Sequence, residues 1–258
     1  MICDAHVHIG YYLRIGCRQP YYYSPKRIEG ILKRCGVSSY VVSSTCAQIK
    51  SISINEIVRE AREIRRVAGS KAHIFFWLSG RLYDDDNNMQ WLKSGMFDGI
   101  KLHNGETPWT TKRQADLRYI LTKAKEMSLP VMIHSGEDEE HSPSRLAVFA
   151  REFSNVRFNF AHCRPMDEMA EIISSCPNVW TDTAYMPLSY FKRLCHYNWH
   201  NRLMFGTDLP VWQAHEDIGM QKRYSEYIAT FKETGLESSS ALAFSNFINP
   251  LDTIHDLA

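Results

Sequence analysis

Two histidines stand one residue apart near the start of the chain, in the apolar stretch ICDAHVHIG. In a β-strand, residues i and i+2 point to the same face, so His6 and His8 project together if this stretch is extended. Two neutral imidazoles side by side form half of a metal site. An isolated H-x-H pair also fits two buried, hydrogen-bonded histidines, so the motif predicts a metal site only if the rest of the chain supplies more ligands.

Other ionisable residues stand near the ends of further apolar runs. The set comprises Lys101, His103, His134, His162 and Asp208. If these runs are strands of one parallel barrel, their C-terminal ends meet at a single mouth, where such barrels build their active sites. Several nitrogen donors with one carboxylate match the needs of a zinc-like ion, which takes three or four N or O ligands about 2 Å away and keeps one position for water. The residues therefore predict a divalent metal, with zinc as the expected ion.

The elements that must position these side chains are short β-branched or aromatic runs separated by longer segments of helical period. Eight such runs recur: ICDAHVHI, SSYVVSS, AHIFFWLS, DGIKLH, LPVMIHS, VRFNFAH, VWTDTA and RLMFGTD. Alternation of strand and helix favours a parallel sheet with crossover helices, and eight repeats in 258 residues predict an α/β fold, a single (β/α)8 TIM barrel over residues 1–258. A G-x-G-x-x-G motif or a Walker loop, which would favour an open doubly wound sheet, is absent from the sequence.

Two of the intervening segments carry a clear helical stripe. Residues 54–69 are expected to bury one face of a helix, formed by Ile54, Ile57, Val58, Ala61 and Ile64. Gly69 is placed to end that helix. Residues 115–127 repeat the pattern with Leu117, Ile120, Leu121 and Ala124.

Composition excludes several classes of partner. Lysine and arginine total 30 against 29 acidic residues, and a net charge of +1 gives no electrostatic footprint for nucleic acid or an anionic membrane. The sequence shows no signal peptide and no apolar run near the ~18 residues of a membrane span. The seven cysteines are an odd number without a C-x-x-C pair, which favours reduced thiols in the cytoplasm. We expect a small-molecule substrate, and the sequence leaves a homo-oligomer open.

The motifs DAHVHI, IKLH, PVMIHSGED, FNFAHC and FGTD, in this order, resemble the strand-end signatures of the amidohydrolase superfamily of metal-dependent (β/α)8 hydrolases. The resemblance spans nearly the whole chain. Many members carry a flanking β-sandwich that places H-x-H well into the chain, whereas here it comes at once. This departure points to the compact branch called amidohydrolase family 2, which includes aromatic-acid decarboxylases and lactone hydrolases. Compact DNases of the superfamily have a glutamate at the end of the fourth strand, where this chain has GIKLHN.

The resemblance implies a role for each candidate residue. His6, His8 and Asp208 would hold the more buried metal, and His134 would complete that site or help to hold a second. His162 would be a ligand of the second metal or would polarise the carbonyl group of the substrate. Asp208 would also take the proton of the attacking water.

Lys101 leaves two arrangements open under the same resemblance. In dihydroorotase-like relatives a lysine in a similar context is carbamylated and bridges two metals. In compact relatives GIKLH surrounds a single metal, and Lys101 would then be an inward ammonium paired with a carboxylate. We favour one metal, with His103 as a hydrogen-bonding residue of the rim.

The loops after the strands are expected to ring the mouth of the barrel. Their candidate residues are Tyr11, Tyr12, Arg14, Arg18, Trp109, Glu137, Arg164, Trp212 and His215. An aromatic wall suits a planar or carboxylated small molecule, and Arg18 or Arg164 is placed to bind a carboxylate.

The predicted activity is metal-dependent hydrolysis of an amide, ester or lactone, because a bound divalent ion supplies hydroxide at neutral pH. Decarboxylation of a small unsaturated or aromatic carboxylic acid is the alternative. A non-catalytic binding barrel would be favoured by loss of a ligand, but none of the expected set is missing. A trinuclear phosphatase-like site needs further acidic ligands, for which only Asp182 is available.

Overall fold

The computed structural model describes residues 1–12, 21–49, 52–78, 86–103, 114–136, 139, 141–210 and 217–249. Its strands are β1 (Ile2–Tyr12), β2 (Tyr21–Tyr23), β3 (Val37–Ser44), β4 (Ala72–Trp77), β5 (Gly99–Leu102), β6 (Val131–His134), β7 (Phe158–Ala161), β8 (Val179–Asp182) and β9 (Leu203–Met204). Each of the eight predicted runs overlaps one of the strands β1 and β3 to β9, which confirms the predicted alternation.

The strands form one curled sheet in the order β2-β1-β3-β4-β5-β6-β7-β8-β9. All strands except β2 run parallel to their neighbours. The segment after β9 returns to β1: Ala5 N donates to Phe205 O at 2.8 Å, and Asp208 N donates to His6 O at 2.8 Å. The two ends of the parallel sheet are therefore joined, as a TIM-barrel-like fold requires.

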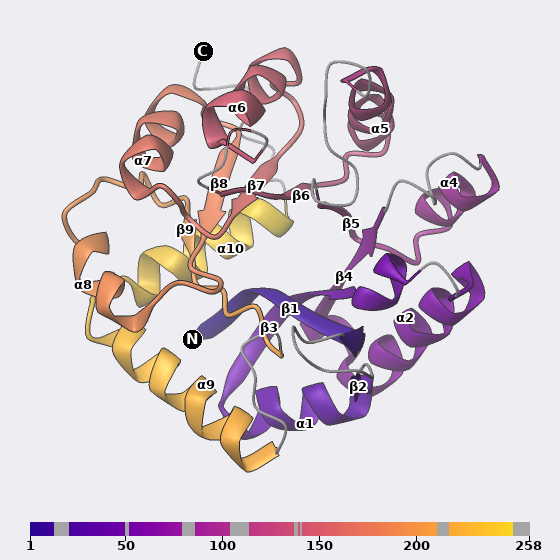
Figure 1. The fold of residues 1–258 in the computed structure, drawn as a ribbon, viewed down its shortest axis with the longest axis horizontal. Coiled ribbons are helices and arrows are strands. Elements are labelled where there is room, and N and C mark those ends of the chain that lie inside the picture. Colours follow the sequence, from indigo (N-terminus) through magenta and orange to yellow (C-terminus); the bar gives the residue numbers. More distant parts are fainter. Residues whose placement is uncertain are drawn as a thin grey trace.

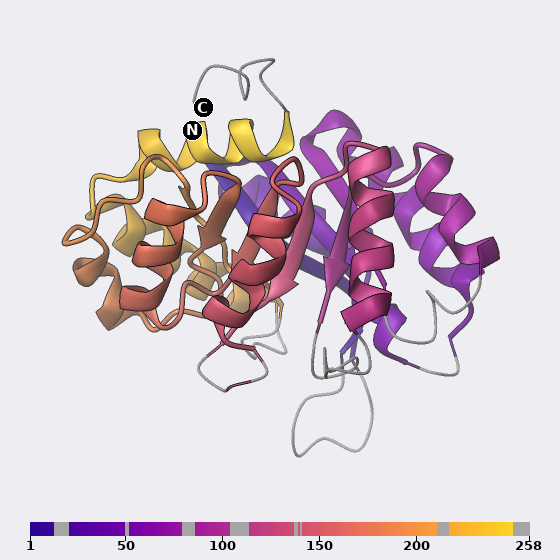
Figure 2. The ribbon, with the colours of Figure 1, turned by 90° about the horizontal axis from the view of Figure 1, so that it is seen from above.

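Helices surround the sheet (Figure 1). They are α1 (Pro25–Arg34), α2 (Ile54–Ala68), α4 (Asp86–Lys93), α5 (Gln114–Glu126), α6 (Pro143–Glu152), α7 (Met166–Ser175), α8 (Phe191–Leu194), α9 (Asp217–Lys232) and α10 (Glu237–Ile248), with 3-10 turns η1 (Thr45–Gln48), η2 (Gly69–Lys71) and η3 (Leu188–Tyr190). The last helix, α10, crosses the end of the sheet where the strands begin, beside the N-terminus (Figure 2). Its Phe244 and Phe247 pack with inward residues of the strands, including Cys3, Phe75 and Met132.

The two predicted helical stripes are confirmed. In α2 the residues Ile57, Val58, Ala61 and Ile64 are buried, and Ile54 at the first position is partly buried. Gly69 ends α2 with a φ of +62°, a left-handed conformation that glycine adopts without strain. In α5 the predicted stripe of Leu117, Ile120, Leu121 and Ala124 is buried.

Strand β1 carries the H-x-H motif and changes partner along its length. Its parallel pairing with β3 ends at Ile9, and residues 10–12 pair antiparallel with β2. Gly10 has a φ of +98°, and a Cβ there would lie 2.9 Å from Cys46 Sγ, so the crossover requires glycine. Asp4 pairs with Tyr40 and Val7 pairs with Val42, so β1 contains one more residue than β3 between these two pairs. The extra residue forms a bulge between Asp4 and Val7, which reorients side chains where the strand approaches the candidate site.

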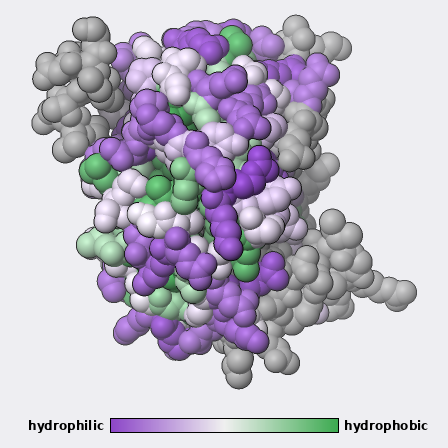
Figure 3. Space-filling view, turned by 90° about the vertical axis from the view of Figure 1, so that its left-hand side faces the viewer, coloured by the Kyte–Doolittle hydropathy of each residue, from purple (hydrophilic) through white to green (hydrophobic). Residues whose placement is uncertain are grey.

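The face that carries α7 and α8 shows mainly hydrophilic side chains, with smaller hydrophobic groups between them (Figure 3). Among the described residues, no helix is long and apolar enough to cross a membrane. The six cysteines of the described part are free thiols, as the odd cysteine count led us to expect.

Candidate metal centre

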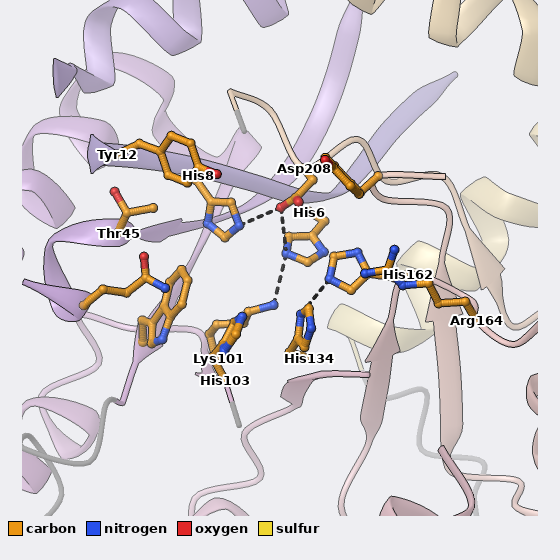
Figure 4. A pocket seen from close by; sticks show the side chains of 13 residues that line it. His6, His8, Tyr12, Thr45, Lys101, His103, His134, His162, Arg164 and Asp208 are labelled. Atoms are coloured by element: carbon orange, nitrogen blue, oxygen red, sulfur yellow. Dashed lines mark hydrogen bonds and ion pairs between the residues drawn. The ribbon is translucent and has the colours of Figure 1, made fainter. Parts of the chain in front are cut away.

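A cavity of about 280 Å³ lies at the end of the sheet to which the predicted strand-end residues point. Figure 4 shows these side chains converging on it from different strands. Its lining contains all of the predicted site residues: His6, His8, Lys101, His134, His162 and Asp208. The structure thus brings together residues from β1, β5, β6, the turn after β7 and the segment after β9.

His6, His8 and Asp208 converge on one point of the cavity wall. His8 Nε2 lies 2.9 Å from Asp208 Oδ1, and His6 Nε2 lies 3.4 Å from the same oxygen. One donor atom from each of the three residues falls within 4.8 Å of the others, and all three side chains are buried. This set offers two imidazole nitrogens and one carboxylate oxygen, the ligand types that zinc prefers.

The other side of the His6 ring faces a second carboxylate. His6 Nδ1 lies 3.3 Å from Asp182 Oδ2, and this buried nitrogen makes no hydrogen bond within the described residues. A buried nitrogen without a partner is the kind of atom that a bound group would satisfy. The donor set therefore fits a bound cation, and a carboxylate behind a ligating histidine is a common support for metal sites.

Asp182 itself is held rigidly at the end of β8. Asn159 Nδ2 donates to its Oδ2 at 2.7 Å, while the backbone N–H groups of His162 and Ala184 donate to Oδ1 at 3.1 Å and 2.9 Å. Burial raises the pKa of Asp182, but His6, His162 and these hydrogen bonds lower it further, so its pKa ends below the usual range. From the sequence, Asp182 is expected to matter only as a ligand of a trinuclear site. Its position at the end of the run VWTD is the signal that could have identified it as a site residue.

Lys101 lies against the same group. Its Nζ is 3.0 Å from His6 Nε2, its side chain is buried, and the ammonium stands 5.8 Å from the centre of the Trp77 ring. The lysine thus supplies a positive charge to the Nε2 lone pair of His6, next to Asp208.

His162 and His134 form a second pair. His162 Nδ1 lies 3.0 Å from the carbonyl oxygen of Ala184, which can only accept, so Nδ1 donates and Nε2 is left as an acceptor. His162 Nε2 in turn lies 2.9 Å from His134 Nδ1. Burial lowers the pKa of His162 to about 3, and burial with the nearby His162 ring lowers the pKa of His134 far below its usual range. Both rings are therefore neutral at physiological pH.

The charges of the centre favour an ionised base beside a neutral imidazole. Burial raises the pKa of Asp208, but the His6 ring and the hydrogen bond of His8 lower it more, and the pKa ends well below its usual range. Burial lowers the pKa of His8 to about 4, although Asp208 opposes this shift. Asp208 also adopts a φ of +64°, a left-handed backbone that is uncommon outside glycine and asparagine.

Aromatic rings form one wall of the cavity. His103 stacks between His134, at 4.1 Å between ring centres, and Trp77, at 5.9 Å. Burial lowers the pKa of His103 to about 3. Trp77 was not among the sequence candidates, because its run AHIFFWLS reads as ordinary core. Tyr12 and Arg164 line the cavity as expected of rim residues, whereas Tyr11 packs against Tyr22.

Several predicted rim residues lie outside the described residues. They are Arg14, Arg18, Trp109, Glu137, Trp212 and His215.

Comparison with protein families identifies the class. The model of the Amidohydrolase family matches residues 85–235, more than half of the chain, so the chain belongs to this family. It is an enzyme of the amidohydrolase superfamily, as the strand-end motifs predicted. Comparison with curated proteins finds no match.

Solved structures with the same fold cover nearly the whole chain. A probable 2-pyrone-4,6-dicarboxylic acid hydrolase from Acinetobacter baumannii has 11% identity and a TM-score of 0.66 over 96% of this chain and 98% of its own. An amidohydrolase from Burkholderia multivorans with bound zinc has 11% identity and a TM-score of 0.64 over 94% and 95%. IDCase from Metarhizium anisopliae has 12% identity and a TM-score of 0.60 over 95% and 96%. At these identities the likeness shows the fold alone.

Proposed function

We propose that the chain is a metal-dependent hydrolase that acts on an amide, ester or lactone of a small molecule. The observation that carries the proposal is the convergence of His6, His8 and Asp208, whose donor atoms lie within 4.8 Å of one another on the cavity wall. Membership of the Amidohydrolase family and the fold shared with a probable pyrone hydrolase support it.

His6, His8 and Asp208 would hold one divalent ion, with zinc as the expected metal. Such an ion, when bound, acidifies its water ligand to a pKa of about 7 and polarises a carbonyl group. We propose a single ion because His6, His8 and Asp208 supply the three protein ligands of a catalytic zinc site. Carbamylation of Lys101, with a second ion near His134, is the alternative that mass measurement separates.

The side chains around the ion divide the proton chemistry between them. Asp208 is ionised and accepts the proton of the attacking water, then passes it to the leaving amine or alkoxide. His162 is fixed by the Ala184 carbonyl, so its Nε2 accepts from His134 and cannot donate to a carbonyl group. The donor that faces the carbonyl oxygen of the substrate is Lys101. Lys101 stabilises the negative charge that develops on the substrate oxygen.

The remaining features of the proposal concern the whole molecule. We propose that residues 1–258 form a single (β/α)8 barrel without a flanking β-sandwich and that the substrate is a small molecule. The joined ends of the sheet support the closed barrel. From the net charge we expect neither nucleic-acid nor membrane partners. The cytoplasmic location is a prediction from the sequence, and the oligomeric state is not predicted.

Decarboxylation is a second candidate because Arg164 lines the same cavity, where a guanidinium binds a carboxylate well. IDCase from Metarhizium anisopliae shares this fold. Release of carbon dioxide, in place of a ring-opened acid, would identify this reaction.

The test combines metal content with product analysis. Protein purified without chelator is assayed for metal per chain, and its intact mass is measured under non-acidic conditions to detect a carbamate on Lys101. Wild type, His8→Ala and Asp208→Asn are then assayed with a panel of lactones, esters, amides and unsaturated carboxylic acids. We expect about one ion per chain and turnover that both variants lose. Full turnover after complete metal removal, or in His8→Ala, would overturn the proposal.

A further inference from the structure

A second cavity adjoins the candidate metal centre on the far side of His162. It has a volume of about 320 Å³ and lies between the turn that precedes α7 and the segment 185–193. Three residues, His162, Arg164 and Tyr185, line both cavities. Figure 4 shows Arg164 beyond His162, away from His8. The two cavities are therefore neighbouring parts of one elongated site, with Arg164 at their junction.

Arg164 has no acidic partner among the described residues, whereas Arg65 is paired with Asp98 at 2.7 Å and Arg118 with Glu152 at 2.7 Å. Other arginines that lack an acidic partner bond elsewhere, such as Arg34 to Gln221 and Arg202 to the Cys176 carbonyl. Arg164 makes neither a hydrogen bond nor an ion pair with any described residue, and it contacts the Tyr185 ring, 5.9 Å from the guanidinium carbon. Within the described part of the chain its five N–H donors are therefore available to a ligand.

The walls that hold Arg164 are rigid. The Tyr227 hydroxyl is buried and lies 2.7 Å from the carbonyl oxygens of both Thr183 and Met186, on either side of Tyr185. The His162 ring is bonded to the Ala184 carbonyl in the same turn. His162 has a φ of +79° and Tyr185 a φ of +57°, and such strained backbone persists only where the surroundings determine it. The cleft is thus preformed, which lowers the entropic cost of binding.

The other charges of the second cavity leave it positive on balance. It contains two arginines, Arg164 and Arg193, and one carboxylate, Asp167. Asp167 accepts a short hydrogen bond from the Tyr197 hydroxyl, so its charge is partly taken up within the protein. Arg193 stands over the Tyr190 ring at 5.5 Å. A planar anion is the ligand that two arginines above aromatic rings accommodate best.

We propose that this second cavity binds a carboxylate of the substrate and that Arg164 determines this specificity. The substrate would then be a small molecule with two separated functional groups: the reacting group against His6, His8 and Asp208, and a distal carboxylate on Arg164. The placement of the reacting group rests on the proposed function, whereas the binding of the distal carboxylate does not require turnover.

The direct test is calorimetric titration of the metal-loaded protein with unsubstituted dicarboxylates from malonate to adipate and with monocarboxylates of matched length. We expect one length of dicarboxylate to bind about tenfold or more tightly than its monocarboxylate. Arg164→Met is expected to remove this advantage, and Arg164→Lys to restore part of it, because lysine keeps the charge without the planar fork. Arg118→Met is the matched control, since Arg118 also stands over an aromatic ring, that of Phe149.

The inference is wrong if Arg164→Met keeps the full dicarboxylate preference while its melting temperature is that of wild type, or if Arg118→Met loses the preference equally. If Arg164→Met does not fold, Arg164→Lys provides the test. An unchanged preference of Arg164→Lys for the dicarboxylate would show that the planar guanidinium of Arg164 has no role in that preference. Turnover separates this inference from the proposed function. An Arg164-dependent preference without any hydrolysis would refute only the function. Hydrolysis of neutral and acidic esters that Arg164→Met slows equally would refute only the carboxylate site.

Discussion

The candidate metal centre and the adjoining cleft differ in how their ionisable groups are paired. In the centre, each ionisable group contacts another: Asp208 meets His8 and His6, and His6 meets Lys101 and Asp182. In the cleft, Arg164 contacts an aromatic ring, and no described carboxylate pairs with it. Under the two proposals, the side chains of the centre hold an ion together, while the donors of Arg164 in the cleft are kept for a group of the substrate.

The largest expected effect comes from removing a charge in the centre. Asp208→Asn should lower turnover by about 10²- to 10⁴-fold, the usual contribution of a general base, and should also reduce metal content. Elemental analysis and steady-state kinetics measure both. Asp167→Asn, in the cleft, is the control for metal binding and should keep the metal content of wild type. Equal losses of metal in both variants would remove the distinction between the two regions.

Metal removal should distinguish the regions by stability. An ion present at a hundredfold excess over its Kd stabilises the folded chain by about 2.7 kcal/mol, which corresponds to about 5–10 °C in melting temperature for a chain of this size. Scanning calorimetry before and after dialysis against chelator measures the shift. Arg164→Met should show the same shift as wild type. His8→Ala should show none, and a normal shift in His8→Ala would contradict the ligand assignment.

A pH-dependent contact supports the wall of the centre next to Thr45. Glu60 of α2 is buried, accepts a hydrogen bond from Ser44, and lies 3.4 Å from Cys46 Sγ. Burial raises the pKa of Glu60 above its ordinary value of 4.5, although Ser44 and Cys46 oppose this shift. The folded chain therefore holds this proton more tightly than the unfolded chain, so the contribution of Glu60 to stability is complete below pH 4.5 and is lost as pH rises through the raised pKa.

Glu60→Gln tests that assignment, because glutamine keeps the uncharged form at all pH values. Urea unfolding between pH 4 and 8 should show wild type losing stability relative to the variant, on the order of 1 kcal/mol per pH unit within the window. Parallel profiles for the two proteins would show that Glu60 does not titrate as described. Dicarboxylate binding in the cleft should be unchanged.

The smallest effect is expected at Tyr185. Replacing it with leucine removes the ring beneath the Arg164 guanidinium but keeps the donors, so dicarboxylate affinity should fall by about two- to fivefold, equivalent to ~0.5–1 kcal/mol. Calorimetric titration measures the change, with Tyr119→Leu as the control, because the Tyr119 ring lies under Lys123 outside both cavities. A loss as large as that of Arg164→Met would mean that Tyr185 itself binds the ligand.

The strands and the family could be predicted from the sequence because their signals are local. Runs such as LPVMIHS are apolar and short, and five of the eight carry a predicted site residue near their C-terminal end. The boundaries were less accurate: β9 ends at Met204, and the extended backbone beyond it is held by β1 up to Asp208. That pairing is set by closure of the sheet, which no local pattern encodes.

Other features depend on neighbours that are distant in the sequence. Asp182 supports His6 across the sheet, and residues 21–23 form β2 against the end of β1. The serine-rich start of α10 gives little helical signal, yet Phe244 and Phe247 close the interior. Arg164 could be selected from the sequence as a residue that binds a carboxylate, but the second cavity and the lack of an acidic partner among the described residues are properties of three-dimensional packing.

The bond between His8 and Asp208 has a consequence for the order of assembly, because 200 positions of sequence separate its two ends. During synthesis the histidines emerge before the carboxylate, and seven further strands of the parallel sheet lie between them. Loop-closure entropy opposes this contact until the intervening strands have docked. Uptake of the proposed ion would therefore follow closure of the sheet, and a chain arrested before residue 208 should bind metal far more weakly than one that includes it.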